Sequence, residues 1–409
     1  MEAVSPSVTN APALPHDEGG QWKPLDLTSL ESRRRLVAAA GGLIRGVRYG
    51  ALYYDLEWRF REQSDWSGAL VYAREGTGGY GAYAPFVRQS RPLPFRLGEV
   101  TVASAALQRY TLVGEPLLAE NDVRRAAERI EELLGAIRPR LGNREALFFE
   151  GLPTDSPTYR VITTHDDVER NYLVVQLGAP FDHQFIELPA TYADYMKQLG
   201  SRSRQSVQYS ERKLERDMEG KVRAVCFEDS GTLDRFLADA EAVSRKTYQW
   251  NVLGLGLRSS EFEQRLRFAA GRGSLRSYIL YCRDVPAAFM LGYQYGDCYY
   301  YTDVGYDPEY ANWSVGSVLQ LKVLQDLYAR DNRPSLFDFS TGYGSHKGRF
   351  GNLARREANV LLLPNTVANR LLASAFLATE RVSSAAVSFV DWLGLKARLK
   401  KAIRRFSTR

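Results

Sequence analysis

The chain has 409 residues, of which 44% are hydrophobic and 25% are charged. This composition is close to the average of globular proteins, and a chain of this length forms two or three domains. Its 54 basic and 48 acidic side chains leave a net charge of +6, without the broad basic stripe typical of nucleic-acid binding. No apolar run is long enough to span a membrane, and the N-terminus lacks the pattern of a secretory signal. These features exclude fibrous, disordered and membrane-spanning chains and argue against a nucleic-acid partner.

The cysteines and histidines indicate no metal site. Cys226, Cys282 and Cys298 lie far apart and form no Cys-x-x-Cys pair, which is typical of a protein from a reducing cytoplasm. The chain has four histidines, and none is followed by another four residues later. We therefore expect a cytoplasmic protein without a catalytic metal.

The first half of the chain predicts a tail followed by one α+β unit. Residues 1–28 are rich in Ser, Pro and Ala and predict a flexible tail. Residues 30–48 predict a helix, and short Val- and Tyr-rich runs broken by Gly and Pro predict strands. A second helix begins after Asn121, the expected N-cap, and two further strands follow it. We expect this first unit to occupy residues 29–178.

The second half repeats this order of elements over residues 179–365. Helices are expected over 191–199 and 201–218, with Thr191 and Ser201 as N-caps, and over 230–247 and 314–330. A long hairpin is expected to turn at Arg283 and Asp284. Residues 366–409 predict a basic amphipathic helical tail. The expected fold class is α+β, with two tandem units that each hold a mixed, mainly antiparallel sheet flanked by helices.

The strongest local signal is a strand, a loop and a helix that follow one another over residues 298–330. Ser314 is expected to cap the helix, and Gly316 leaves the amides of the first turn open to a ligand. Backbone amides and the helix dipole at such a position suit a pyrophosphate. The alternative is ordinary helix capping with no ligand.

The second signal is an aspartate inside an apolar strand. Asp338 lies between Phe337 and Phe339, so strand alternation turns it away from both. The turn after the strand brings His346, Lys347 and Arg349 close to its end. A carboxylate with cations at a strand terminus is typical of an active-site rim. The alternative is an aspartate whose only partners are loop amides.

Together these motifs resemble the CelD-like and Fem-like branch of the GNAT N-acyltransferases. The matching segments are LGSRSRQSVQYSERKL, VPAAFMLGYQYGDCYYYTDVGYDPEYANWSVGSVL and FDFSTGYGSHKGRF, between about residues 199 and 351. The resemblance implies two tandem GNAT-like units, of which the second holds an acyl-CoA. It departs from the superfamily at Trp313, which stands where the phosphate loop has Arg or Gln.

The resemblance also implies which residues form the site. Asp338 is the first candidate for the general base and Asp303 the second; Lys347 would stabilise negative charge, and Tyr301 would protonate the leaving thiolate. The residues implied for donor binding are Val304, Gly305, Tyr306, Ser314, Val315, Gly316 and Ser317. Those implied for acceptor binding are Arg204, Trp250, Tyr343 and His346.

The expected function is N-acylation. Acetyl-CoA or another acyl-CoA would be the donor, and the acceptor would be an amine of a sugar, a polysaccharide precursor or a cell-envelope component. One alternative is a Fem-like aminoacyl transferase. Another is a non-catalytic scaffold that binds a glycan or a partner in an envelope or exopolysaccharide assembly.

The end of the chain predicts a peripheral membrane contact. Residues 396–409 carry seven basic side chains and no acidic one. Apolar residues recur at steps of three or four from Trp392 to Phe406, so residues 391–409 would form a basic amphipathic helix. Such a helix suits the anionic inner face of a membrane. The alternative is a helix that packs on the body of the protein.

Overall fold

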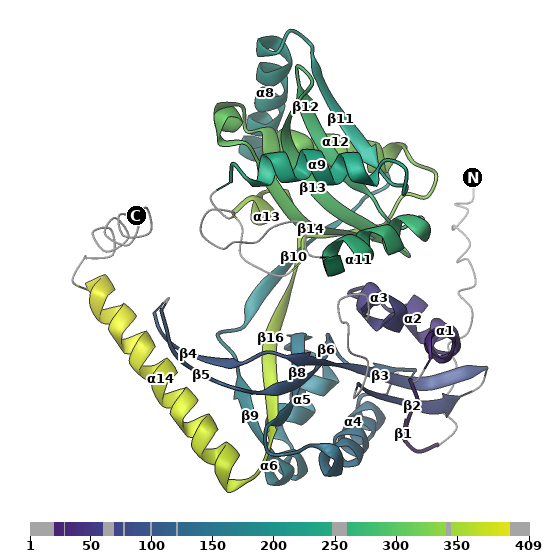
Figure 1. Ribbon diagram of the computed structural model, residues 1–409, viewed down its shortest axis with the longest axis vertical. Coiled ribbons are helices and arrows are strands. Elements are labelled where there is room, and N and C mark those ends of the chain that lie inside the picture. The colour runs from purple at the N-terminus through teal and green to yellow at the C-terminus, as the bar shows by residue number, and fades with distance from the viewer. Residues whose placement is uncertain are drawn as a thin grey trace, which may run out of the picture.

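The computed structural model describes residues 20–392 except 28, 60–68, 77, 99, 120–121, 248–259 and 341–344. Two α+β units are stacked along the long axis of the molecule (Figure 1). Twelve strands in one continuous order, β1-β2-β3-β6-β8-β16-β10-β15-β14-β13-β12-β11, run through both units, while β7 pairs with β3 and β9 pairs with β16. The predicted class, mixed sheets flanked by helices in two tandem units, is confirmed.

The first unit contains a sheet, a covering layer of helices and a separate hairpin. Its strands are β1 (Lys23–Pro24), β2 (Leu70–Gly76), β3 (Gly79–Ser90), β6 (Gln108–Val113), β7 (Leu117–Leu118), β8 (Glu145–Pro153) and β9 (Tyr172–Gln176), with the hairpin β4 (Leu93–Leu97) and β5 (Val100–Ala105). Its helices are α1 (Leu30–Ala39), α2 (Gly41–Gly46), η1 (Ala51–Tyr54), α3 (Leu56–Arg59), α4 (Val123–Ile137), η3 (Arg138–Arg140), α5 (Pro157–Thr164) and α6 (Asp166–Asn171).

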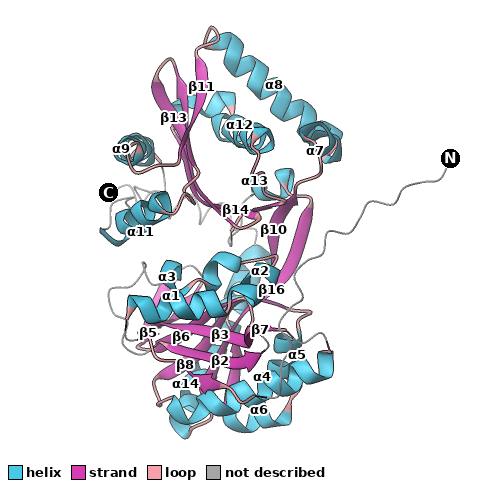
Figure 2. Cartoon of the chain, turned by 90° about the vertical axis from the view of Figure 1, so that its right-hand side faces the viewer, coloured by secondary structure: helices cyan, strands magenta, loops and turns pink. Residues whose placement is uncertain are grey.

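The second unit has helices on both faces of its sheet (Figure 2). Its strands are β10 (Phe181–Glu187), β11 (Val222–Phe227), β12 (Ser277–Cys282), β13 (Val285–Tyr295), β14 (Cys298–Tyr306) and β15 (Leu336–Asp338). Its helices are α7 (Tyr192–Gln198), α8 (Ser201–Asp217), α9 (Leu233–Ser244), α11 (Ser260–Gly271), η4 (Pro308–Trp313), α12 (Val315–Ala329) and α13 (Ser345–Phe350). One apolar core lies under α7, α8 and α12, and a second lies under α9 and α11.

The chain returns to the first unit at its end. Strand β16 (Leu353–Pro364) pairs with β10 over its first residues and with β8 and β9 over the rest. Helix α14 (Val367–Trp392) then packs on β4 and β9. Chain order alone assigns residues 353–365 to the second unit, whereas their strand pairing ties the two units together. The boundaries 29–178 and 179–365 therefore stay a prediction about folding units.

Two of the expected helix caps differ in the structure. Helix α4 is capped by the side chain of Asp122, which accepts from the amides of Arg124 and Arg125, while Asn121 lies outside the described residues. Helix α8 is preceded by Gly200, so Ser201 is its first helical residue. The expected hairpin turn is present, because Arg283 and Asp284 both have the positive φ angles, 50° and 65°, that a two-residue turn requires.

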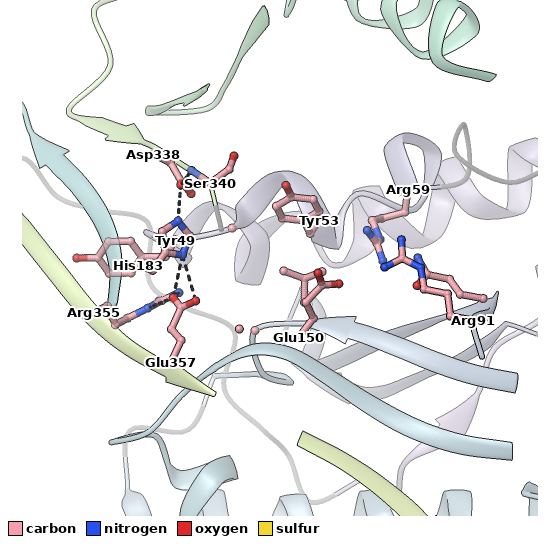
Figure 3. Close-up of a pocket in the computed structure, with 15 residues that line it drawn as sticks. Tyr49, Tyr53, Arg59, Arg91, Glu150, His183, Asp338, Ser340, Arg355 and Glu357 are labelled. Carbon is pink, nitrogen blue, oxygen red and sulfur yellow. Dashed lines mark hydrogen bonds and ion pairs between the residues drawn. The ribbon is translucent and has the colours of Figure 1, made fainter. Parts of the chain in front are cut away.

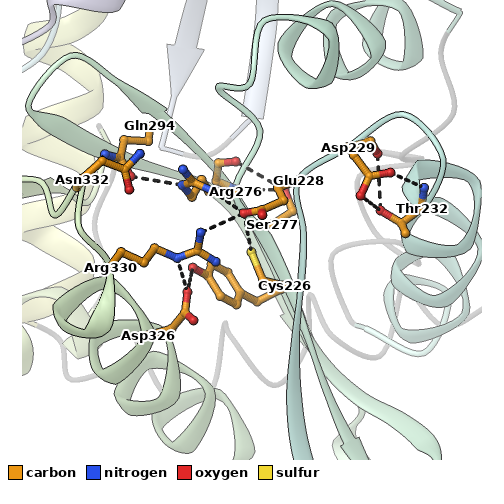
Figure 4. Close-up of polar contacts among 12 residues, drawn as sticks. Cys226, Glu228, Asp229, Thr232, Arg276, Ser277, Gln294, Asp326, Arg330 and Asn332 are labelled. Carbon is orange, nitrogen blue, oxygen red and sulfur yellow. Dashed lines mark hydrogen bonds and ion pairs between the residues drawn. The ribbon is translucent and has the colours of Figure 1, made fainter.

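A polar network fixes the end of α12 that lies farthest from its N-terminus (Figure 4). Glu228 accepts hydrogen bonds from Arg276 and Arg330, and Arg330 also donates to Asp326 at 2.7 Å. The hydroxyl of Tyr278, on β12, donates to Asp326 at 2.7 Å. These contacts hold α12 against β11 and β12, so its N-terminal turn is presented from a firmly attached helix.

Candidate active site

A cavity of about 570 Å³ opens between β14 and the start of α12. Strands β14 and β15 pair only over Cys298–Tyr300 and Leu336–Asp338, so β14 continues without its parallel neighbour. This stretch of β14 is paired with β13 but not with β15 and forms one wall of the cavity. Tyr301 lies at its inner end. All seven residues implied for donor binding line this cavity: Val304, Gly305, Tyr306, Ser314, Val315, Gly316 and Ser317. We call it the donor cavity.

The start of α12 offers two free backbone donors to the donor cavity. Ser314 occupies the N-cap position, but its backbone is left-handed (φ 52°, ψ 41°) and its side chain caps no amide, contrary to the expectation. Among the described residues, the amides of Val315 and Gly316 have no acceptor. An anion in the cavity would therefore meet two N–H groups at the positive end of a 15-residue helix.

Two further residues of the donor cavity have roles that the sequence did not indicate. A Cβ on Gly305 would lie 2.5 Å from the Phe289 ring, so this glycine makes room for a neighbouring strand and not for a ligand. Gln320 is 3% exposed and lines the cavity, and its Nε2 has no hydrogen-bond partner in the described structure. A buried amide without a partner is costly, so Gln320 is poised to donate to a bound molecule.

A second cavity, of about 200 Å³, lies between the two units (Figure 3). Asp338, at the end of β15, lines it, while Phe337 and Phe339 pack in the core under α12. Strand alternation thus turns Asp338 away from both phenylalanines, as the sequence predicts. The other charged residues of this inter-unit cavity are Arg59, Arg91, Glu150, His183, Arg355 and Glu357.

Asp338 belongs to a line of buried charges that the sequence did not reveal. His183, on β10, contacts Asp338 Oδ1 through Nε2 at 2.6 Å and both carboxylate oxygens of Glu357 through Nδ1 at 3.1 Å. Arg355 donates to Glu357 from Nε at 2.8 Å. The His183 ring also stacks on Phe185, with 4.2 Å between the ring centroids. Charges of alternating sign thus run from Asp338 to Arg355.

His183 is an imidazolium at neutral pH. Burial alone would lower its pKa, but the charges and hydrogen bonds of Asp338 and Glu357 outweigh burial and raise the pKa to about 9. Both ring nitrogens then donate, one to each carboxylate. Asp338 Oδ1 also accepts from the amide of Ser340 at 2.6 Å, while no hydrogen bond to Oδ2 is found among the described residues. Oδ2 is therefore the oxygen available to a molecule in the inter-unit cavity.

Ser340 lies at the junction of the two cavities. It lines the inter-unit cavity, and its hydroxyl donates at 2.6 Å to the carbonyl of Tyr301, which lines the donor cavity. Its own carbonyl accepts from Lys347 Nζ at 3.0 Å. Its backbone is left-handed, with φ at 55°. The donor cavity and Asp338 are thus separated by one residue with a strained backbone conformation.

The remaining predicted catalytic residues lie in different surroundings. Lys347 is buried against the Ser340 carbonyl, and burial lowers its pKa. Burial raises the pKa of Tyr301, which therefore stays protonated. Asp303 pairs with Leu291 after a bulge in β14 and lines neither cavity described above. Its side chain is exposed, yet enough protein surrounds it for desolvation to raise its pKa.

The residues implied for acceptor binding are not brought together. Arg204 donates to the carbonyl of Met196 at 3.3 Å and lines neither cavity. Trp250 and Tyr343 lie outside the described residues. His346 is in α13, where only its backbone is described. Of the predicted polar residues, Asp338 is the one that lines the inter-unit cavity.

Residues 201–348 match the family described as "Acetyltransferase (GNAT) domain". This segment contains Asp338 and every residue that lines the donor cavity except Phe350. The chain thus contains a GNAT acyltransferase domain.

The solved structure of FemX shows the same fold over most of the chain, and two further structures are similar with lower scores. FemX is 11% identical, covers 86% of this chain and 100% of its own, and superposes with a TM-score of 0.59. The C-terminal domain of a putative lysylphosphatidylglycerol synthetase from Agrobacterium fabrum is 11% identical, with coverages of 85% and 96% and a TM-score of 0.49. A tandem GNAT protein from the clavulanic acid biosynthesis pathway is 10% identical, with coverages of 85% and 100% and a TM-score of 0.48. No curated protein matches the sequence. The GNAT domain is therefore set in a two-unit fold like that of FemX.

Proposed function

We propose that this GNAT protein transfers an acyl group from acyl-CoA to an amine bound in the inter-unit cavity. The observation that supports this most directly is the junction at Ser340. A cavity with free amides lies on one side of this residue, and a carboxylate oxygen without a hydrogen bond lies on the other. Acyl transfer needs a site for the acyl donor and a proton acceptor next to it.

The chemistry of the donor cavity supports an acyl-CoA as the donor. The amides of Val315 and Gly316 would hold the pyrophosphate, since both are free and lie at a helix N-terminus. Gln320 Nε2 would donate to a carbonyl of the donor. Trp313, in place of the usual Arg or Gln, donates to Asp217 at 2.9 Å, so the phosphate contacts here rest on backbone amides. Acetyl is the acyl group that we propose this site to transfer.

The reaction needs a neutral amine, and Asp338 is placed to generate it. Its Oδ2 would take a proton from the acceptor ammonium, and His183 would keep the carboxylate oriented through Oδ1. The amine nitrogen then forms a bond to the thioester carbonyl carbon, the carbon–sulfur bond breaks, and the thiolate accepts the further proton that the nitrogen loses on becoming an amide. Tyr301, protonated because its pKa is raised, would donate a hydrogen bond to that sulfur. Lys347 would act by holding the Ser340 carbonyl in place.

We propose a chemical class of acceptor and not a single compound. The inter-unit cavity carries cations and carboxylates together, which suits an amine on a sugar, a polysaccharide precursor or another cell-envelope component. The reaction would take place in the cytoplasm, and contact of residues 391–409 with the inner face of the membrane would bring the enzyme to such acceptors. Residues 393–409 lie outside the described part of the chain.

The test is binding followed by turnover. Acetyl-CoA should raise the melting temperature, and the protein should release free thiol from it with at least one member of a panel of amines and amino sugars. A protein stabilised by acetyl-CoA but inactive with every amine would have the donor site without the proposed acceptor. No stabilisation by any acyl-CoA would contradict the donor assignment, and activity with aminoacyl-tRNA alone would identify a transferase of the aminoacyl type.

A further inference from the structure

Helix α14 and the β4–β5 hairpin form an apolar flank on the first unit. Seven of the twelve large hydrophobic side chains that are exposed in the described chain belong to these three elements. They are Leu97, Val100 and Val102 on the hairpin and Val367, Leu371, Leu377 and Val382 on α14. The amide of Gly98, at the hairpin tip, donates to the Ser383 hydroxyl at 2.8 Å, so the two elements lie side by side (Figure 1). We call this surface the α14–hairpin face.

Helix α14 is apolar on two opposite sides. Asn369, Ala373 and Phe376 are buried, with Ala373 and Phe376 in the core shared with β4, β8, β9 and β16. The spacing of 3.6 residues per turn places Val367, Leu371 and Val382 on the opposite side, where they are 76%, 69% and 58% exposed. A surface helix is ordinarily polar on its outer side. The outer side of α14 therefore has the composition of a contact surface.

Among the described residues, the exposed charged side chains beside the apolar stripe are arginines. Arg370 and Arg381 are exposed beside the apolar stripe of α14, and Arg96 is exposed on the hairpin. The sequence that follows α14 has seven basic and no acidic residues between Lys396 and Arg409. An apolar stripe with arginines at its border is the arrangement that lies on an anionic bilayer, with aliphatic carbons in the acyl region and charges among the headgroups.

We infer that the α14–hairpin face docks on the surface of an anionic lipid bilayer. No helix of the described residues is long and apolar enough to cross a membrane. An apolar stripe with an arginine border is the pattern of a helix that lies in the plane of the interface. A second copy of the chain is disfavoured as the occupant, because a two-fold contact through this face would bring like-charged arginine borders together. The inference extends the membrane contact from the tail to the folded body, and it does not depend on the acyltransferase reaction.

The test is co-sedimentation of the full chain with vesicles of phosphatidylglycerol and phosphatidylcholine. The wild type should bind these vesicles at physiological salt and bind pure phosphatidylcholine vesicles weakly. The double variant Leu371→Glu, Val382→Glu keeps the basic tail but places two carboxylates in the apolar stripe. Its partition coefficient should fall at least tenfold. Val123→Glu is the matched control, since Val123 is 53% exposed on α4, and it should bind as the wild type does.

Three outcomes would overturn the inference. Unchanged binding of the double variant would show that the tail alone holds the membrane. Absence of wild-type binding would show that there is no such contact. A wild-type dimer in sedimentation equilibrium, converted to monomer by the double variant, would assign the face to a second copy. Because both substituted positions are exposed, the melting temperatures of all variants should match that of the wild type, which separates docking from unfolding.

Discussion

Asp338 combines burial, a cationic neighbour and one oxygen without a hydrogen bond. It is 3% exposed, His183 and Ser340 occupy Oδ1, and the inter-unit cavity lies before it. A carboxylate in this position is held in one orientation, so its free oxygen meets an acceptor without further ordering. The residue predicted from strand alternation thus lines the cavity that we propose for the acceptor, while its catalytic role stays a proposal.

The first prediction concerns this carboxylate. Asp338→Asn keeps the size and one acceptor atom but removes the charge that takes the proton. The turnover number should fall by about 10²-fold or more, the usual scale for a lost general base, while acyl-CoA affinity stays near the wild-type value. Steady-state kinetics and acyl-CoA titration of the variant measure both. Turnover close to wild type would transfer the role to Asp303 or to a water molecule.

The second prediction concerns the charge on His183. Its pKa in the folded state is raised to about 9, above the unfolded value near 6.5, so it contributes stability that is complete below pH 6.5. That contribution, roughly 3 kcal/mol at most, is lost as the pH rises toward 9 and beyond. Urea unfolding of the wild type should show the loss, and His183→Gln should lack it. An equal pH dependence in the two proteins would contradict the protonated state.

Elements that are continuous in the sequence were predicted better than elements assembled from distant segments. Most residues that line the donor cavity come from one strand, one loop and one helix start between Tyr301 and Gln320, so a local pattern is enough to find these walls. The lining is completed by Thr247, Phe289, Met290 and Phe350. The prediction that the Ser314 side chain caps α12 was wrong. Strand β14 reaches α12 through η4 and a left-handed Ser314, which the helix propensity of the residues does not indicate. Gln320 was missed because it lies within a largely apolar helix.

No local sequence pattern indicated the buried charges that contact Asp338. His183 and Glu357 are 174 residues apart and meet only because β10 pairs with β16. A single polar residue in an apolar strand is visible in the sequence, but its partner is not. The same pairing determines the inter-unit cavity, and this explains why the residues implied for the acceptor, such as Arg204, lie elsewhere.

The third prediction belongs to the start of α12. Gly316→Asp should abolish the stabilisation by acetyl-CoA, because a carboxylate beside the two free amides repels the pyrophosphate and occupies its place. Gly316→Ala is the matched control: a Cβ there would have as its nearest atom Tyr306 Cδ1, at 3.9 Å, so the fold accommodates it. Thermal shift assays with and without acetyl-CoA compare the two. Full stabilisation of the aspartate variant would remove this helix start from the donor site.

At the scale of the whole molecule, the two units share one sheet, and the boundary at residue 178 stays a prediction. Strand β9 pairs with β16 alone, and β8 has β16 on one side. The apolar core of the first unit contains Val360 and Leu362, and the core under α14 contains Leu361 and Phe376. All four residues come from the end of the chain. Contacts between units add to this, since Nη1 of Arg272, the residue after α11, lies 3.2 Å from Asp55 Oδ2.

The fourth prediction follows from this shared sheet. A fragment of residues 1–178 leaves β9 without a partner, exposes one edge of β8 and removes apolar residues from two cores, so it should show no cooperative thermal transition. A chain of residues 1–392 keeps every described element and should unfold in one transition, because loss of β16 opens both units together. Scanning calorimetry and circular dichroism distinguish these cases. A fragment that melts cooperatively would show that the first unit is an independent domain, and the position of Asp338 between the units would then rest on docking of two bodies instead of one continuous sheet.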